Sequence, residues 1–158
     1  MNIFILDDDP YISASMHVDK HIVKMILEHA QMMCTAHHLH PNGNYDIPYK
    51  PTHINHPCNR WLRDSKANYI YLYDMTRYLN NEYKFRYNKD PKQDHKSWLA
   101  IKDLPTPDLP DLPRTPFARA MPDECKIGND AVASYRNYYK TNKQSLFKWS
   151  NRNKPSWI

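Results

Sequence analysis

Residues 57–87 read PCNRWLRDSKANYIYLYDMTRYLNNEYKFRY and form the stretch that decides the fold. Beyond its first position this stretch contains neither proline nor glycine, and apolar residues recur along it every three to four positions. Such spacing places them on one side of an α-helix. The members of this stripe are Trp61, Leu72, Met75, Leu79 and Tyr83. The sequence therefore predicts one long amphipathic helix over residues 57–87, with a proline at its first position.

Two further helices are predicted, one on each side of this stretch. Asp9 followed by Pro10 is a helix-start signal, and the segment 10–38 is expected to be helical, either continuous or broken near His17. The other helix is predicted over residues 130–148, with Asn129 or Asp130 as its N-cap. Residues 2–6, NIFIL, are typical of a short buried strand.

The remaining long segment, residues 91–122, is rich in proline and is predicted not to be helical. Such a stretch wraps a surface or links elements. The chain has 158 residues, a length typical of one domain. We therefore predict a mainly α fold, a single-domain helical bundle with a short N-terminal strand and a Pro-rich wrapping segment.

Composition and charge limit the classes of function. The chain has only two glycines, which argues against a glycine-rich phosphate loop. No apolar run is long enough for a membrane span, the first residues do not resemble an export signal, and three cysteines suit a reducing compartment such as the cytoplasm. The net charge of +5 and the pI of about 9.0 favour an anionic partner, either nucleic acid or a nucleotide.

A polar sector is predicted along the helix that contains residues 17–34. At about 100° per residue, His17, His21, Lys24, Glu28 and Gln31 fall on one side. The two histidines could chelate a metal, but the lysine between them would repel a cation, so no metal and no cofactor is predicted. The same lysine suits phosphate. The plain alternative is a solvated face with a lysine–glutamate pair.

Acid–base chemistry would come from this first helix. We expect Asp19 or Glu28 to act as the acid–base or electrostatic group, and His21 to move a proton near neutral pH. Asp19 and His29 fall on the apolar side of a continuous helix, where each needs a partner. If the helix breaks after His17, the aspartate instead serves as a cap.

A second candidate site is the loop before the long helix. Thr52, His53, Asn55 and His56 lie at a helix start, where free N–H groups and the helix dipole favour anions. Arg63, one turn into the helix, would add bidentate contacts to a phosphate. The alternative is that these residues only cap the helix and that its arginines face water.

A base-binding surface is the third candidate. Trp61 and Tyr69 could stack on a base while Asn68 reads its edge, and Arg86 ends the same stripe with a guanidinium. Aromatic stripes at helical spacing belong to the core more often than to a ligand platform. Basic and aromatic residues also interleave in 83–89 and 135–140, a composition suited to a phosphate backbone.

The chain resembles a functionally unassigned family of small, largely helical proteins encoded by tailed phages, notably marine ones. The resemblance covers nearly the whole chain. The matching blocks are residues 2–7 (NIFILD), 19–25 (DKHIVKM), 51–53 (PTH), 55–57 (NHP), 82–83 (EY), 86–87 (RY), 120–122 (AMP) and 135–136 (YR). It implies a viral protein that works in the host cytoplasm, where such proteins modify, repair or shield DNA or hold host nucleotide signals.

A weaker likeness is to phage base-excision and base-hypermodification enzymes, although the chain has no helix-hairpin-helix glycine motif. The first hypothesis is therefore an enzyme, a hydrolase or glycosylase, that acts on a nucleotide or a DNA base. The second is a non-catalytic protein that sequesters a nucleotide or binds DNA to counter host defence. The third is an interaction protein that docks a partner through the Pro-rich segment.

Overall fold

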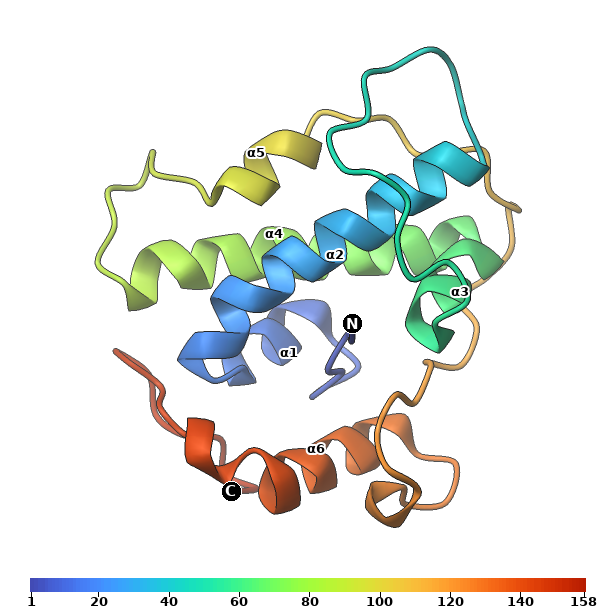
Figure 1. The fold of residues 1–158 in the computed structure, drawn as a ribbon. Helices are drawn as coiled ribbons and strands as arrows, with labels where there is room; N and C mark the ends of the chain where they lie inside the picture. Colours follow the sequence, from blue (N-terminus) through green and yellow to red (C-terminus); the bar gives the residue numbers. More distant parts are fainter.

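The computed structural model describes residues 1–158 and contains six α-helices (Figure 1). They are α1 (Pro10–Met16), α2 (Asp19–Leu39), α3 (Pro57–Asp64), α4 (Lys66–Arg86), α5 (Lys96–Ile101) and α6 (Ala131–Asn142). Two 3₁₀ turns, Asp123–Cys125 and Gln144–Leu146, flank α6. The expectation of a mainly α fold is confirmed. None of these helices combines the length and the apolar character that a membrane span needs.

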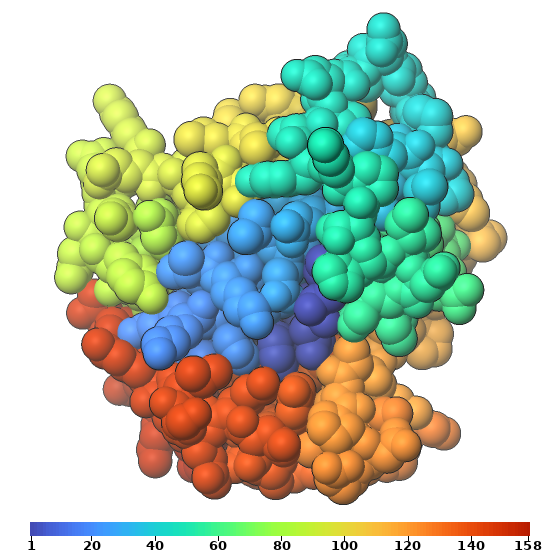
Figure 2. All heavy atoms as spheres, in the orientation of Figure 1, coloured from blue at the N-terminus to red at the C-terminus, as the bar shows by residue number.

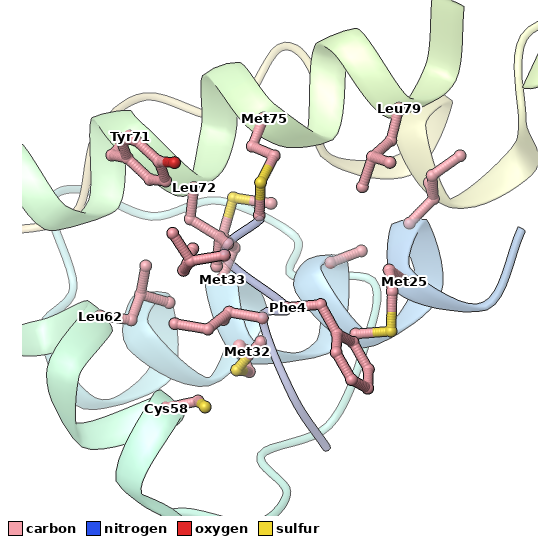
Figure 3. Close-up of a cluster of buried hydrophobic side chains, with 14 of the residues drawn as sticks. Phe4, Met25, Met32, Met33, Cys58, Leu62, Tyr71, Leu72, Met75 and Leu79 are labelled. Carbon is pink, nitrogen blue, oxygen red and sulfur yellow. The ribbon is translucent and has the colours of Figure 1, made fainter. Parts of the chain in front are cut away.

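The two long helices α2 and α4 pack against each other and form the centre of the fold (Figure 1). Their facing side chains are apolar and buried, and α1, α3 and α5 complete the packing around them. Three methionines, Met25 and Met33 of α2 and Met75 of α4, lie in this core beside Leu72 and Leu79 (Figure 3). Methionine is flexible and fills irregular space between helices.

The first predicted helix is broken where one alternative expected it. His17 and Val18 have extended backbone and separate α1 from α2. The break leaves carbonyl groups free at the end of α1, and the buried Arg86 of α4 donates to those of Ser15 and His17 at 2.7 and 2.9 Å. The first N–H of α2, that of Asp19, donates to the carbonyl of Lys148 at 2.9 Å.

The predicted strand at residues 2–6 is wrong, although all five residues are buried. No second strand lies beside them, so side chains satisfy their backbone groups instead. The side chain of Asn2 accepts from the N–H groups of Ile3 and Phe4, and the hydroxyl of Ser13 accepts from that of Leu6. The buried segment turns at Phe4, whose φ of 41° is unusual for a residue with a side chain.

The long helix predicted over residues 57–87 is two helices. Ser65 has extended backbone and ends α3, and its hydroxyl accepts from the N–H of Asn68 at 3.1 Å, so the same serine caps α4. The next N–H, that of Lys66, donates to the carbonyl of Pro110 at 2.8 Å. The Pro-rich segment therefore pairs with the break between the helices.

The Pro-rich segment follows the surface as expected but is not free of helix. The short helix α5 lies between Pro91 and Pro105, and His95 caps it by accepting from the N–H of Ser97 at 3.1 Å. After α5 the chain runs along the ends of α2 and α4, with Leu109 buried in the core. The expectation that residues 91–122 contain no helix is therefore wrong.

The last helix ends earlier than predicted, at Asn142, and Asp130 is its N-cap. The Asp130 carboxylate accepts from the N–H of Ala133 at 2.9 Å. Replacing it with alanine is expected to lower the free energy of unfolding by about 1 kcal/mol, because one N–H of the first turn loses its acceptor. Urea unfolding measures this change. Asp111→Ala, at an exposed position without such a bond, is the control, and an equal effect of both variants would contradict the cap.

Candidate functional site

Arg86 is at the centre of a buried network rather than in an open base-binding surface. Its side chain is 0% exposed, and its Nε donates to Glu82 Oε2 at 2.8 Å. One of its terminal nitrogens donates to Asp19 Oδ1 at 3.1 Å. Arg152 also pairs with Glu82. These contacts join α2, α4 and the C-terminal segment, which gives Arg86 a structural role.

Asp19 is buried in the same network. Its carboxylate accepts from the Ser150 hydroxyl at 2.6 Å and from the Ser150 N–H at 3.0 Å, in addition to Arg86. Burial raises the pKa of Asp19, but the hydrogen bonds from Ser150 and Arg86 outweigh burial and hold the pKa below its usual value. The carboxylate is thus ionised and fully occupied, so it has no free position for a substrate proton.

His17 and His21 are also buried, although the helical wheel placed them on a polar sector. The ring of His17 donates from Nδ1 to the Ser13 carbonyl at 2.8 Å, and its Nε2 has no partner. The ring of His21 stacks on Phe4 at 4.4 Å and hydrogen bonds to the Tyr139 hydroxyl at 2.7 Å. Burial lowers the pKa of His17 to about 4 and that of His21 to about 3. The N-terminal segment and α6 cover this sector. A helical wheel of one helix contains no information about such neighbouring segments.

The loop at residues 52–56 is held by its own contacts. Thr52 Oγ1 is hydrogen bonded to His53 Nδ1 at 2.7 Å, and His53 and Asn55 are exposed. Arg63 donates to the carbonyl of Ile54 at 2.8 Å and to Asn59 Oδ1 at 2.7 Å. The arginine therefore fixes the loop against α3, and part of the hydrogen-bonding capacity of its guanidinium is taken up within the protein.

The predicted base-binding residues belong to the core, as the structural alternative held. Asn68 donates to the carbonyl of Trp61 at 2.7 Å and to the hydroxyl of Thr115 at 2.8 Å, and it accepts from the Thr115 N–H at 3.0 Å. The Tyr69 hydroxyl is hydrogen bonded to His37 Nε2 at 2.9 Å. Trp61 and Tyr69 are both 3% exposed, so neither ring offers a face for stacking.

Glu28 differs from the other predicted catalytic residues because it reaches the surface of α2. Its side chain is 12% exposed, and Lys24, one turn earlier, is 63% exposed with its Nζ 3.5 Å from Glu28 Oε1. The other oxygen, Oε2, accepts from the N–H of Asn2 at 3.0 Å and lies 3.6 Å from the amino group of Met1. Figure 2 shows the N-terminal segment, in dark blue, reaching the surface beside α2.

His56, in the loop before α3, lies close enough to Glu28 and to the Met1 amino group for their charges to act on its ring. Its Nδ1 accepts from the N–H of Cys58 at 3.2 Å, so the proton of the neutral ring is on Nε2, which is a free donor. The pKa of His56 is lowered, first by burial and then by the positive charges of the Met1 amino group and His53, while Glu28 raises it. Glu28, Lys24 and His56 form what we call the Glu28 site.

The structure thus brings together three residues that the sequence placed in two candidate sites. It adds the backbone N–H of Asn2, which fixes the carboxylate and which no local pattern indicates, because the two residues are 26 positions apart. Cys58 lies behind His56, where burial raises the pKa of its thiol to about 12, so it stays protonated. No group of three or more histidine, cysteine or acidic side chains with metal-binding geometry is present.

The Glu28 site combines a carboxylate near solvent with two hydrogen-bond donors. The Glu28 carboxylate reaches solvent, where it can accept a proton, and the lysine ammonium and the imidazole N–H are donors for phosphate or carbonyl oxygens. No protein-family model, curated protein or solved structure matches the chain.

Proposed function

We propose that the protein is an enzyme that acts on a DNA base or a nucleotide, with Glu28 as its acid–base group. The observation that carries the proposal is the half-enclosed carboxylate of Glu28, held by the Asn2 N–H and paired with Lys24. Asp19 and His21 are buried, so the acid–base role is assigned to Glu28, whose carboxylate lies near solvent. The proposed anion site does not include four residues that are buried: Trp61, Asn68, Tyr69 and Arg86.

Each residue of the Glu28 site has a proposed role in hydrolysis of an N-glycosidic bond. Lys24 and the Nε2–H of His56 bind phosphate or base oxygens. Glu28 accepts a proton from a water molecule as the water oxygen bonds to the sugar C1′. The bond from C1′ to the base nitrogen breaks, the base leaves with the electron pair of that bond, and the proton that Glu28 took from water passes to the base. A base in a duplex must first flip out of the stack.

Charge and resemblance support a nucleic acid or nucleotide as the substrate. The net charge of +5 favours an anionic ligand, and the site itself presents two donors beside its carboxylate. The resemblance to phage proteins implies work beside DNA in the cytoplasm of an infected host cell. We therefore propose that the protein acts there.

Glu28→Gln is expected to lower the rate of base release at least about 100-fold, because the amide keeps the shape but cannot accept the proton. Labelled oligonucleotides carrying uracil, oxidised purines or modified pyrimidines are incubated with the protein, and abasic sites are detected by alkaline strand cleavage. Free nucleotides are assayed in parallel by chromatography. The control is Glu124→Gln, at an exposed position in a 3₁₀ turn.

The two variants also separate catalysis from binding alone. If the wild type binds nucleic acid without releasing a base or hydrolysing a nucleotide, the non-catalytic alternative replaces the enzyme. If Glu28→Gln turns over substrate as fast as Glu124→Gln does, the assignment of the acid–base group is wrong. Thermal unfolding of each variant checks that lost activity does not come from lost folding.

A further inference from the structure

The C-terminal part of the chain has a one-sided charge. Residues 131–158 contain no aspartate and no glutamate. The same segment holds the cations Arg136, Lys140, Lys143, Lys148, Arg152 and Lys154. The overall excess of positive charge is therefore concentrated in α6 and the segment after it, which border α2 on the face shown in Figure 2.

Four lysines lie where α2 borders the C-terminal part of the chain. We call them the lysine face: Lys20, Lys24, Lys143 and Lys148. Lys20 and Lys148 line one cavity of about 430 Å³ at the start of α2. The Nζ of Lys143 lies 5.9 Å from the centre of the Phe4 ring, which stacks on His21, and Lys24 follows His21 by one turn of α2. The lysine face thus continues from the Glu28 site across the junction of α2 and α6.

Lys20 has no structural reason to be a lysine. It is the second residue of α2, where the helix dipole disfavours a positive charge. It is exposed and forms no ion pair, and neither Lys143 nor Lys148 forms one. The neighbouring carboxylate of Asp19 is bound by Arg86 and Ser150. The charge of Lys20 is therefore not neutralised within the protein and is free for an external anion.

Lys143 is held in position by aromatic rings. Its Nζ lies 4.7 Å from the centre of the Tyr138 ring and 5.9 Å from that of Phe4. Such cation–π contacts restrict a flexible side chain without neutralising its charge. The ammonium group therefore keeps its attraction for an anion while it loses part of its freedom before binding.

We infer that the lysine face binds the phosphodiester backbone of DNA, so that the substrate is the polymer and not a free nucleotide. This inference rests on the proposed function, because the bound strand would lead to the Glu28 site. Three unpaired cations, spread over the start of α2 and the segment after α6, suit successive phosphates, whereas a single nucleotide needs one cluster. A membrane surface fits less well, since no large exposed hydrophobic side chain lies in residues 17–28 or 138–150.

The test compares two triple variants with the same change of charge. Lys20→Gln, Lys143→Gln and Lys148→Gln together remove three cations of the lysine face and leave Lys24 in place. The control combines Lys66→Gln, Lys92→Gln and Lys96→Gln, three exposed lysines of α4, α5 and the loop before α5 that form no ion pair. Affinity for fluorescein-labelled duplex and single-stranded DNA is measured by anisotropy at several sodium chloride concentrations.

The lysine-face variant is expected to bind DNA at least roughly tenfold more weakly at low salt, and the slope of log affinity against log salt should fall by about two to three units. The control should bind like the wild type. The larger effect on duplex or on single strands shows which form is the ligand. Lys20→Gln alone should unfold no more easily than the wild type, because it removes an unfavourable charge from the helix start.

Equal binding by the two triple variants would overturn the inference, as would a wild type that binds no DNA at low salt. Lysine-dependent binding to phosphatidylserine vesicles without DNA binding would assign the face to membranes instead. Glu28→Gln keeps the lysine face and should keep the salt slope. DNA binding without turnover would thus refute the proposed function alone, and turnover of free nucleotides without lysine dependence would refute only this inference.

Discussion

Replacing Arg86 with alanine is expected to lower the free energy of unfolding by about 3–5 kcal/mol. The substitution leaves the buried carboxylate of Asp19 without a positive partner and that of Glu82 with Arg152 alone. It also removes the donor to the free carbonyl groups of Ser15 and His17 at the end of α1. Because each of these groups has little access to water, neither solvent nor a nearby side chain replaces the guanidinium. Chemical unfolding monitored by circular dichroism measures the loss.

Arg77→Ala is the matched control on the same helix. Arg77 is an exposed residue of α4 whose ion pair with Asp74, at 3.3 Å, is exposed as well. Such pairs contribute between about 0 and 1 kcal/mol, so this variant should remain close to the wild type. A similar stability for the two variants would show that the buried network does not hold α1, α2 and α4 together.

Acidification from pH 6.5 to about 4 is expected to destabilise the protein by several kcal/mol, before most carboxylates are protonated. Burial lowers the pKa of His17 from 6.5 to about 4 and that of His21 to about 3. In this range the unfolded chain binds protons at these histidines while the folded protein does not, so falling pH favours unfolding. For His17, with its ring fully enclosed, the difference corresponds to about 3 kcal/mol at pH 4. The stability is present above pH 6.5.

His17→Asn isolates the contribution of this histidine. The shorter amide replaces the Nδ1 donor to the Ser13 carbonyl but does not titrate. The free energy of unfolding, measured by urea at pH 7 and at pH 5, should therefore fall less in this variant than in the wild type. Arg77→Ala, which changes no histidine, should keep the wild-type difference between the two values. If the free energy of unfolding of His17→Asn falls between pH 7 and pH 5 as much as that of the wild type, the assignment of a neutral, buried His17 ring is wrong.

Much of the fold was predictable because helical periodicity is a local signal. The stripe from Trp61 to Tyr83 correctly indicated helix, but continuity across Ser65 was wrong even though a serine three residues before Asn68 is a capping signal. Burial of residues 2–6 was predictable from their apolar character. That these residues do not form a strand was not predictable, because a strand needs a neighbouring strand, and the absence of one is a property of the whole chain.

The candidate site was predictable only in part, for a similar reason. Lys24 and Glu28 are one helical turn apart, so their pairing followed from the wheel. The burial of His21 depended on Phe4 and Tyr139, which come from distant parts of the chain. The wheel describes one helix in isolation and cannot show which side other segments cover. The effect of the Glu28 charge on His56 likewise depends on the packing of α2 against α3, which no local pattern indicates.

The bonds from Ser150 to Asp19 and from Arg152 to Glu82 have a consequence for synthesis on the ribosome. A nascent chain that has emerged only as far as α6 can form α2 and α4, but Asp19 and Glu82 then lack their last partners. Hydrogen bonds between positions so far apart also cost the most chain entropy to close. The last contacts of this network can therefore form only after residue 152 has been synthesised.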